Sequence, residues 1–431
     1  MKPFRIESAF PSEKKPLYSS LMATPYMILL FAMAEICLAQ TFPPLPEGNT
    51  GIAARHPGDA GIAADTAVIY ADDFESYTSA AGLTANWNGG VYHDVRIATE
   101  SSHVFAGAKS VEFRLPKQDI EWSNTVARDL SKSQELTMLF LRYYTKFDTS
   151  FDISGSCHNG GGMSAHYFIN GQATPGVKAN GYNKFLMEFE SWRGDSTEPN
   201  PGHLNVYIYH PAQRDIWGDH FFPDGTVLPW TYLAGDFGGS FVPRANIVCK
   251  LGQWYCCELM VKANTLGVKD GRVACWLDGA LIADFQNLEL RKADSLKINR
   301  FNLSLHSKSN LKNETFKWYD NVVAAKSYIG PLSSPGPVRS QPNPATGSFN
   351  PSVFGTTISF ELVKPLPVIV DIYTVQGVMI KSLVNRTFFA GSHSIRWDGR
   401  DGTGLPVAAG MYLTRIRTTD KSWTARMTIT R

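Results

Sequence analysis

Short segments in which apolar and polar residues alternate constrain this chain more than any other feature. They recur between turn-forming residues along most of the sequence, and no long segment shows the 3.6-residue period of a helix. Side chains of a strand point alternately to opposite faces, so each such segment predicts a strand with one face in a core. The chain is therefore expected to be all-β.

The clearest example is residues 180–222, which predict two strands joined by a polar turn. Phe185, Met187 and Phe189 fall on an apolar face, which is expected to face the core. The opposite faces of the two strands carry polar and aromatic residues, namely Lys184, Glu188, Glu190, Trp192, Asn205, Tyr207 and Tyr209. Such a face suits a sugar chain, whereas the alternative is an ordinary solvated outer face of an antiparallel sheet.

Two further strands are expected to extend this face. Arg142 shares one face of the segment 135–147 with aromatic residues, and His306 lies on the polar face of the segment 298–306. If the four strands lie side by side, they form one wide concave platform. We predict that Lys184, Glu190, Tyr207, Tyr209 and His306 converge there, with Arg193 or Arg142 near them to bind a carboxylate.

The Gly-rich segment 152–181 contains few strand-forming residues and is expected to be a long loop. It carries His158 and His166 and runs directly into the strand that begins near Lys184. A loop that folds over the platform would make these two histidines reserve candidates for a catalytic base.

Segments rich in Pro, Gly and Ser divide the chain of 431 residues into domains. Residues 1–39 combine a basic region with a short apolar run and small residues before a cleavage point, which predicts a signal peptide. Residues 40–66 are expected to be a leader or linker, 67–331 a two-sheet sandwich, 332–352 a linker, and 353–431 a small immunoglobulin-like sandwich.

Charge and cysteine content limit the function further. The net charge of +2 argues against nucleic acid as a partner, because such binding needs a concentrated basic surface. Five cysteines remain after residue 39, so at least one thiol is free or forms an intermolecular bond. The protein is expected to be a monomer. Cys256 and Cys257 are adjacent in a strand and point to opposite faces, so they are not expected to bond each other.

Acidic residues end the first strand of the large domain and begin its last one. If these strands pair, as the ends of a jelly roll commonly do, Asp73 and Glu75 approach Asp320. Oxygen ligands grouped in this way suit a structural Ca²⁺. The alternative is a set of ordinary strand-end acids that accept hydrogen bonds from turn amides.

The last eighty residues contain FNPSVFGTTISFEL, VDIYTVQGVMIKSLV, GSHSIRWDGRDGTGLPVAAGMYLTRI and TARMTITR. These pieces resemble the C-terminal sorting domain of type IX secretion cargo. The resemblance implies the outer-membrane secretion machinery as a partner and a secreted or cell-surface location. It implies no chemistry.

The large domain contains DDFES, NGYNKFLMEFESWRGD, LNVYIYHP and KWYDNVVAAKSYIGP. Together with residues 252–285, these pieces resemble the jelly-roll polysaccharide lyases of the alginate- and glucuronan-lyase type. The resemblance implies a concanavalin-like β-jelly roll, a polyuronate-like polysaccharide as substrate, and no cofactor for the chemistry.

Those lyases cleave uronic-acid chains by β-elimination, which needs a base, an acid and a group that neutralises a carboxylate. Tyr207 and Tyr209 resemble the paired tyrosines of the alginate-lyase pattern, and Lys184 resembles its strand lysine. Ser191 and Arg193 have the spacing of the family's Ser-x-Arg, although alternation puts them on the face opposite Lys184.

Two other functions are compatible with the same fold, because a fold does not fix a function. A non-catalytic carbohydrate-binding protein would use the same polar, aromatic face. A glycoside hydrolase would need two carboxylates, and Glu188 and Glu190 lie on one face, although the E-x-D-x-x-E pattern of sandwich glucanases is absent.

Overall fold

The computed structural model describes residues 42–229, 234–332, 352–354, 357–362, 366–388, 391–419 and 422–429. Strands dominate these residues, and the helical elements among them are short 3₁₀ turns: Ile52–Arg55, Pro57–Asp59, Ile62–Ala64, Ala80–Ala85, Ser101–His103, Lys132–Gln134 and Ala234–Phe237. Within the described ranges, no helix has the length and apolar character needed to cross a membrane. The predicted signal peptide, residues 1–39, and most of the predicted linker 332–352 lie outside them.

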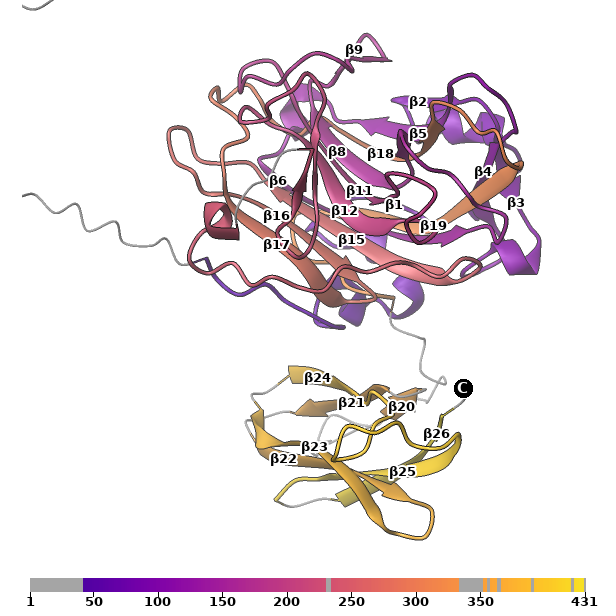
Figure 1. Cartoon of the computed structure of the whole chain (residues 1–431), viewed down its shortest axis with the longest axis vertical. Coiled ribbons are helices and arrows are strands. Elements are labelled where there is room, and N and C mark those ends of the chain that lie inside the picture. Colours follow the sequence, from indigo (N-terminus) through magenta and orange to yellow (C-terminus); the bar gives the residue numbers. More distant parts are fainter. Residues whose placement is uncertain are drawn as a thin grey trace, which may run out of the picture. The chain divides into compact units, whose positions relative to one another are not determined.

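The large domain consists of two antiparallel sheets (Figure 1). The first, here called sheet A, has the order β17 (Ala280–Leu288), β16 (Gly271–Leu277), β15 (Trp254–Lys262), β6 (Met138–Phe147), β19 (Thr315–Ala325), β4 (Ser110–Leu115) and β3 (Val95–Ala98), with β1 (Val68–Asp72) also paired to β19. The pairing of β1 with β19 places Asp72 opposite Val322. The first and last strands of the large domain therefore pair, as the sequence predicts.

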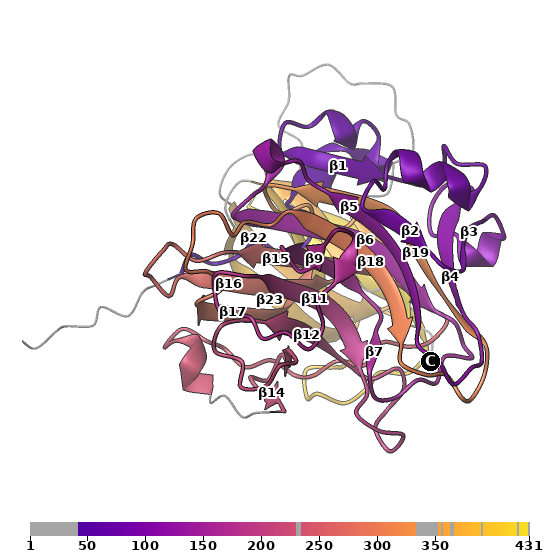
Figure 2. The ribbon, with the colours of Figure 1, turned by 90° about the horizontal axis from the view of Figure 1, so that it is seen from above.

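Sheet B carries the candidate site. Its order is β14 (Val227–Leu228), β13 (Asp219–Phe221), β12 (His203–Tyr209), β11 (Phe185–Trp192), β8 (Gly161–Ala165), β18 (Arg300–Ser307), β5 (Trp122–Asp129) and β2 (Gly90–Tyr92). The short strand β7 (Cys157–His158) also pairs with β18, and β9 (Phe168–Ile169) forms a separate hairpin with β10 (Gln172–Ala173). Figure 2 shows β12, β11 and β18 in the middle of this sheet.

The core fills the space between the two sheets. From sheet B it takes the alternate residues Phe185, Met187 and Phe189, and from sheet A it takes residues such as Leu139 and Leu141. Each of these side chains is at most 2% exposed, so burial holds every strand in a register that turns the remaining residues outward. The prediction of a jelly-roll sandwich is confirmed.

One predicted strand belongs to the other sheet. Strand β6, which was expected to extend the polar platform, lies in sheet A, and its outward face carries Phe140 and Arg142. Ile52 and Ile62 from the segment expected to be a leader or linker are buried against this face together with Phe140. The prediction that β6 joins the platform is wrong, because alternation identifies the face of a strand but not its sheet.

The C-terminal residues form a second, smaller sandwich, which confirms the predicted fold of 353–431. One sheet contains β20 (Ser352–Phe354), β21 (Thr357–Leu362) and β24 (Gly391–Arg396), and the other contains β23 (Met379–Phe388), β22 (Leu366–Thr374), β25 (Gly410–Arg417) and β26 (Ser422–Ile429). Its own core includes Ile358, Val370, Trp397 and Ile416.

All five described cysteines are buried free thiols. Cys257 and Cys275 lie in the core between the sheets, whereas Cys256 points to the other face of β15, next to Arg142 and Tyr144. The expectation that adjacent Cys256 and Cys257 point to opposite faces is thus met.

Candidate functional site

The outward face of sheet B brings together residues from five strands. In one row across the sheet, Tyr207 lies opposite Glu188, Glu188 opposite Gly162, and Gly162 opposite Asn302. In the next row, Asn205 lies opposite Glu190. The same face carries Trp192 and Ser304, and His306 pairs with His158 of β7. We call this surface the sheet-B face.

A turn between β7 and β8 places His158 on this face. Asn159 anchors the turn, because its side chain donates to the Ser191 carbonyl at 2.7 Å and accepts from the Ser191 amide at 3.1 Å. A Cβ at Gly160 would overlap the carbonyl oxygen of Phe189, so only glycine permits the turn to lie this close to β11. The turn thereby places His158, from a segment that the sequence predicts as a loop, on the outward face of sheet B.

His158 and Glu190 form a hydrogen-bonded pair at the centre of the face. The distance from His158 Nδ1 to Glu190 Oε2 is 3.0 Å, and the two side chains are 26% and 0% exposed. An ionised carboxylate only accepts, so Nδ1 carries the proton. The other oxygen of Glu190 lies 3.8 Å from Nδ1 of His220, which itself lies 2.9 Å from Asn205 Oδ1.

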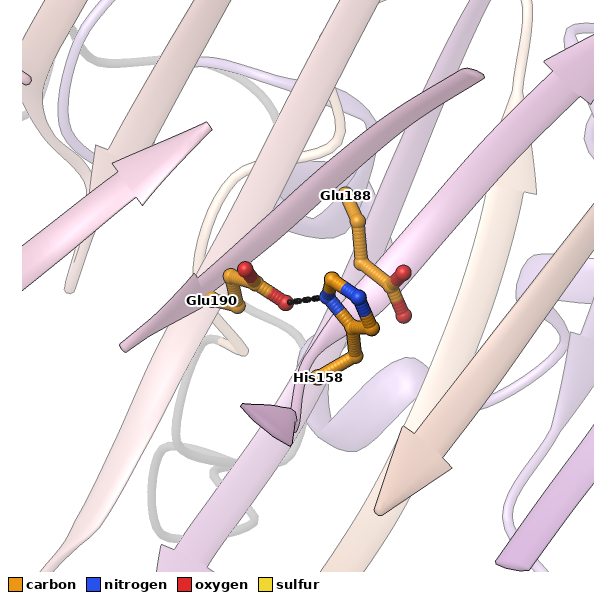
Figure 3. Close-up of side chains that lie close together, drawn as sticks. All are labelled: His158, Glu188 and Glu190. Atoms are coloured by element: carbon orange, nitrogen blue, oxygen red, sulfur yellow. Dashed lines mark hydrogen bonds and ion pairs between the residues drawn. The ribbon is translucent and has the colours of Figure 1, made fainter. Parts of the chain in front are cut away.

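Glu188 completes a compact group. Figure 3 shows the imidazole of His158 between the carboxylates of Glu188 and Glu190. Each of the three residues offers one ligand atom, and these atoms all lie within 4.8 Å of one another. The hydroxyl of Ser304 donates to Glu188 from strand β18, which lies on the other side of β8. We call His158, Glu188 and Glu190 the central group.

A strip of aromatic rings crosses the face over the central group. The ring centroids of His306 and His158 are 5.6 Å apart, and those of His158 and Tyr207 are 4.7 Å apart. The strip continues from Tyr207 to His220 at 4.8 Å and from His220 to Trp192 at 4.4 Å. Sugar rings stack on flat aromatic surfaces of this kind.

Burial and charge act in opposite directions on the pair. Burial opposes protonation of His158, but the charge and hydrogen bond of Glu190 outweigh it and raise the pKa of the imidazole. Burial also raises the pKa of Glu190, against the effect of His158. Burial, together with the charge of His158, lowers the pKa values of His220 and His306 to about 3.

The predicted pair of a lysine and a tyrosine lies at one end of this face. Lys184 Nζ is 4.6 Å from the ring centroids of both Tyr209 and Tyr167, and it donates to the carbonyl and hydroxyl of Thr174. Burial lowers the pKa of Lys184 to about 8. Lys184 and Tyr209 are only 2% and 1% exposed, so neighbouring residues cover both groups.

Tyr207 lies closer to the central group than Tyr209 does. Its hydroxyl accepts a hydrogen bond of 2.9 Å from the amide of Gly218, and burial raises its pKa. A phenolate base needs a lowered pKa, so these surroundings keep the hydroxyl of Tyr207 protonated. Among the described residues, the buried hydroxyl of Tyr209 has no hydrogen-bond partner.

Neither arginine considered for carboxylate binding lies on the sheet-B face. Arg142 is fully buried on the outer face of sheet A, where it pairs with Asp59. Arg193 follows β11, pairs with Asp152, and donates to the carbonyls of Ser196 and Glu198 at 2.8 Å each. The prediction that Arg142 lies near this face is wrong, because β6 belongs to the other sheet, and the contacts of Arg193 are those with Asp152, Ser196 and Glu198.

His166 has a left-handed backbone at the end of β8, with φ of 50°, and its amide donates to Asn299 Oδ1 at 3.1 Å. Among the described residues, no ring contact links His166 to the aromatic strip.

His220 belongs to the aromatic strip, but the sequence analysis does not identify it. The reason is that β13 has only three residues, which is too few for alternation to identify a strand.

The acids proposed for Ca²⁺ accept backbone hydrogen bonds. Asp320 Oδ2 accepts from the amides of Phe105 and Ala106 at 2.9 and 3.2 Å, and Glu75 Oε1 accepts from Ala108 at 2.7 Å. Asp73 Oδ1 accepts from the amide of Glu75 at 3.1 Å. In the described ranges, these acids do not form a group as close as the central group, and a Ca²⁺ bound to them stays a prediction.

No family model matches the sequence, and none of the curated proteins compared matches it significantly. The alginate lyase Aly36B is similar in structure, with a TM-score of 0.42 and 18% identity over 60% of this chain and 97% of the lyase. The PL-14 alginate lyase of Aplysia kurodai gives 0.39 and 12%, over 55% and 90%. The endo-β-1,4-glucuronan lyase of Trichoderma reesei gives 0.35 and 13%, over 61% and 92%. These likenesses concern the fold alone.

Proposed function

We propose that the sheet-B face binds a uronic-acid-containing polysaccharide and cleaves it by β-elimination. The observation that carries the proposal is the convergence of a pair between a half-buried histidine and a buried glutamate with a strip of aromatic rings on one partly open face. Aromatic surfaces with a few convergent polar and titratable groups are typical of ligand sites.

The strip supplies the binding surface for the sugar chain. Rings from His306 to Trp192 follow one another across the strands, so successive sugar units have successive rings to lie on. Because the rings are held by strands rather than by a loop, their spacing is fixed before the chain binds, which reduces the entropy lost on binding.

The reaction breaks the C5–H and C4–O bonds and forms a C4=C5 double bond. The C5 proton passes to a base, and the leaving oxygen receives a proton from an acid. We assign the base to His220, because its Nδ1 donates to Asn205 Oδ1 and its Nε2 therefore carries a lone pair. We assign the acid to Tyr207, whose ring lies beside both His220 and His158. The central group lies beside both residues, with His158 next to Tyr207 and Glu190 next to His220.

The ultraviolet absorbance of the unsaturated product tests this proposal on a panel of polyuronates. We expect Tyr207→Phe and His220→Ala to lower kcat/KM by about 10²–10⁴-fold, the usual contribution of an acid or base. Tyr373→Phe, in the C-terminal sandwich, is the matched control and is expected to leave kcat/KM unchanged. Turnover that survives in both variants would refute the assignment.

A non-catalytic carbohydrate-binding protein is the second candidate. It is favoured by the commitment of Arg142 and Arg193 to other contacts, which takes both guanidinium groups away from the sheet-B face. Saturable binding of a polyuronate without unsaturated product would support it. New reducing ends without that absorbance would instead indicate a hydrolase.

We also propose that residues 353–431 direct export through the outer membrane, after a signal peptide at 1–39 has been removed, so that the protein is secreted or held at the cell surface. The supporting observations are the resemblance of the C-terminal pieces to sorting domains and the separate hydrophobic core of this small sandwich. Deletion of 353–431 should leave the protein inside the outer membrane, which cell fractionation measures.

A further inference from the structure

Two groups in the described part of the chain each combine one histidine with two glutamates. In the first, His103 lies 3.7 Å from Glu100 and 3.5 Å from Glu112. Arg96 occupies the carboxylates of this group, because its guanidinium donates to Glu100 at 2.9 Å and to Glu112 at 2.5 and 2.8 Å. A bidentate arginine of this kind satisfies the carboxylates fully.

The central group on the sheet-B face has no such arginine. Within the described ranges, the ion pairs of Glu190 are those with His158 and His220, and Glu188 is held by the neutral hydroxyl of Ser304. The lysine whose charge acts on Glu190 is Lys317, which lies fully buried in the core. With both carboxylates ionised, the central group carries a net charge of −1 even when His158 is protonated.

Two buried oxygens at the central group also lack a hydrogen-bond donor. Glu190 Oε1 is fully buried and has no hydrogen-bond partner among the described residues, and the same holds for Asn302 Oδ1. Asn302 and Glu188 lie on either side of Gly162. A Cβ added at Gly162 would lie 3.1 Å from Asn302 Oδ1, so the glycine leaves space beside this oxygen. A buried oxygen left without a partner is costly, so these atoms point to a bound positive species.

We propose that His158, Glu188 and Glu190 bind one divalent metal ion of the Zn²⁺ or Mn²⁺ type. A neutral imidazole with two carboxylates is a donor set that suits these ions, which bind such ligands at about 2.0–2.2 Å. An imidazolium at His158 releases its extra proton to solvent when the ion binds. The ligand atoms lie within 4.8 Å of one another, so they need to close by about 1 Å around an ion with those bond lengths. The partly exposed side of His158 leaves a position open towards the substrate.

The role of the ion rests on the proposed function. β-Elimination requires a positive group at the C6 carboxylate, and the arginines considered for that role lie elsewhere. A divalent ion at the central group would coordinate one carboxylate oxygen and stabilise the negative charge that develops as the C5 proton leaves.

Metal binding is tested on the full chain after treatment with a chelator. Titration calorimetry with Zn²⁺ and the visible absorption of Co²⁺ should both give one site per chain. His158→Ala and Glu190→Gln should each weaken binding by at least about 100-fold, more than the loss typical of outer ligand contacts. His103→Ala is the matched control and should bind as the wild type does, because Arg96 already occupies the carboxylates of that group. Thermal unfolding of each metal-free variant verifies that it folds.

The outcomes separate the metal site from the proposed function. Absence of a saturable Zn²⁺ isotherm for the wild type, or equal binding by folded His158→Ala, overturns the metal site. Lyase turnover that is unchanged in the chelated protein overturns the catalytic role of the ion and leaves the lyase function standing. One-site binding without turnover on any polyuronate supports the metal site and argues against the lyase.

Discussion

The fully buried ion pair between Arg142 and Asp59 offers a sharp test of how the segment before β1 contributes to stability. The guanidinium is 0% exposed and the carboxylate 8% exposed, and Arg142 also donates to the carbonyls of Asn321 and Gly330 at 3.1 and 3.4 Å. Replacing Asp59 by Ala leaves a buried positive charge without its counter-ion. Such a change costs about 3–5 kcal/mol in general.

The two carbonyl acceptors remain in the variant, so we expect the lower end of that range, about 3 kcal/mol. A domain of this size loses about 2–4 °C in Tm per kcal/mol, which predicts a decrease of about 6–12 °C. Thermal unfolding of the chain, followed by circular dichroism or calorimetry, measures it. Arg142→Met together with Asp59→Ala removes both charges and should recover most of the loss.

Arg55→Ala is the matched control on the same segment. It breaks the pair with Asp65 at 2.7 Å, in which the arginine is 62% exposed, and such exposed pairs contribute at most about 1 kcal/mol. If Asp59→Ala lowers the Tm no more than Arg55→Ala does, the segment does not bury its carboxylate against sheet A in the way described, and the reasoning fails.

Further predictions concern the turn, a buried acid, the linker and the second tyrosine. Gly160→Ala should lower stability and displace His158, since its Cβ meets a β11 carbonyl, and thermal unfolding measures the loss. Burial raises the pKa of Glu258 from 4.5 to about 7, so the folded state retains a proton that the unfolded state has released. Stability should therefore fall as pH rises through that window, and Glu258→Gln should remove this fall in pH-dependent unfolding. Limited proteolysis should cut within 332–352, and cutting elsewhere first would argue against a linker. Tyr209→Phe should change kcat/KM less than about 10-fold, whereas a loss of about 10²–10⁴-fold would identify Tyr209 as the base.

Alternation in the sequence was sufficient to predict one half of the candidate site. Glu188, Glu190, Tyr207 and Asn205 lie on the outward face of sheet B because their neighbours Phe189 and Val206 must be buried. A slip of one residue would exchange the two faces, so the hydrophobic core fixes the register and with it the direction of every polar side chain. This information is local, and the sequence alone contains it.

Tertiary structure decided which strands share a sheet and which loop residue joins them. Arg142 and Glu190 both lie on outward strand faces, yet they belong to opposite sides of the sandwich. His158 reaches the central group through a turn that depends on Gly160, and His220 reaches it on a strand of three residues. Sheet membership and loop position depend on pairing between residues far apart in the chain. The alternation within one strand does not indicate which other strand pairs with it.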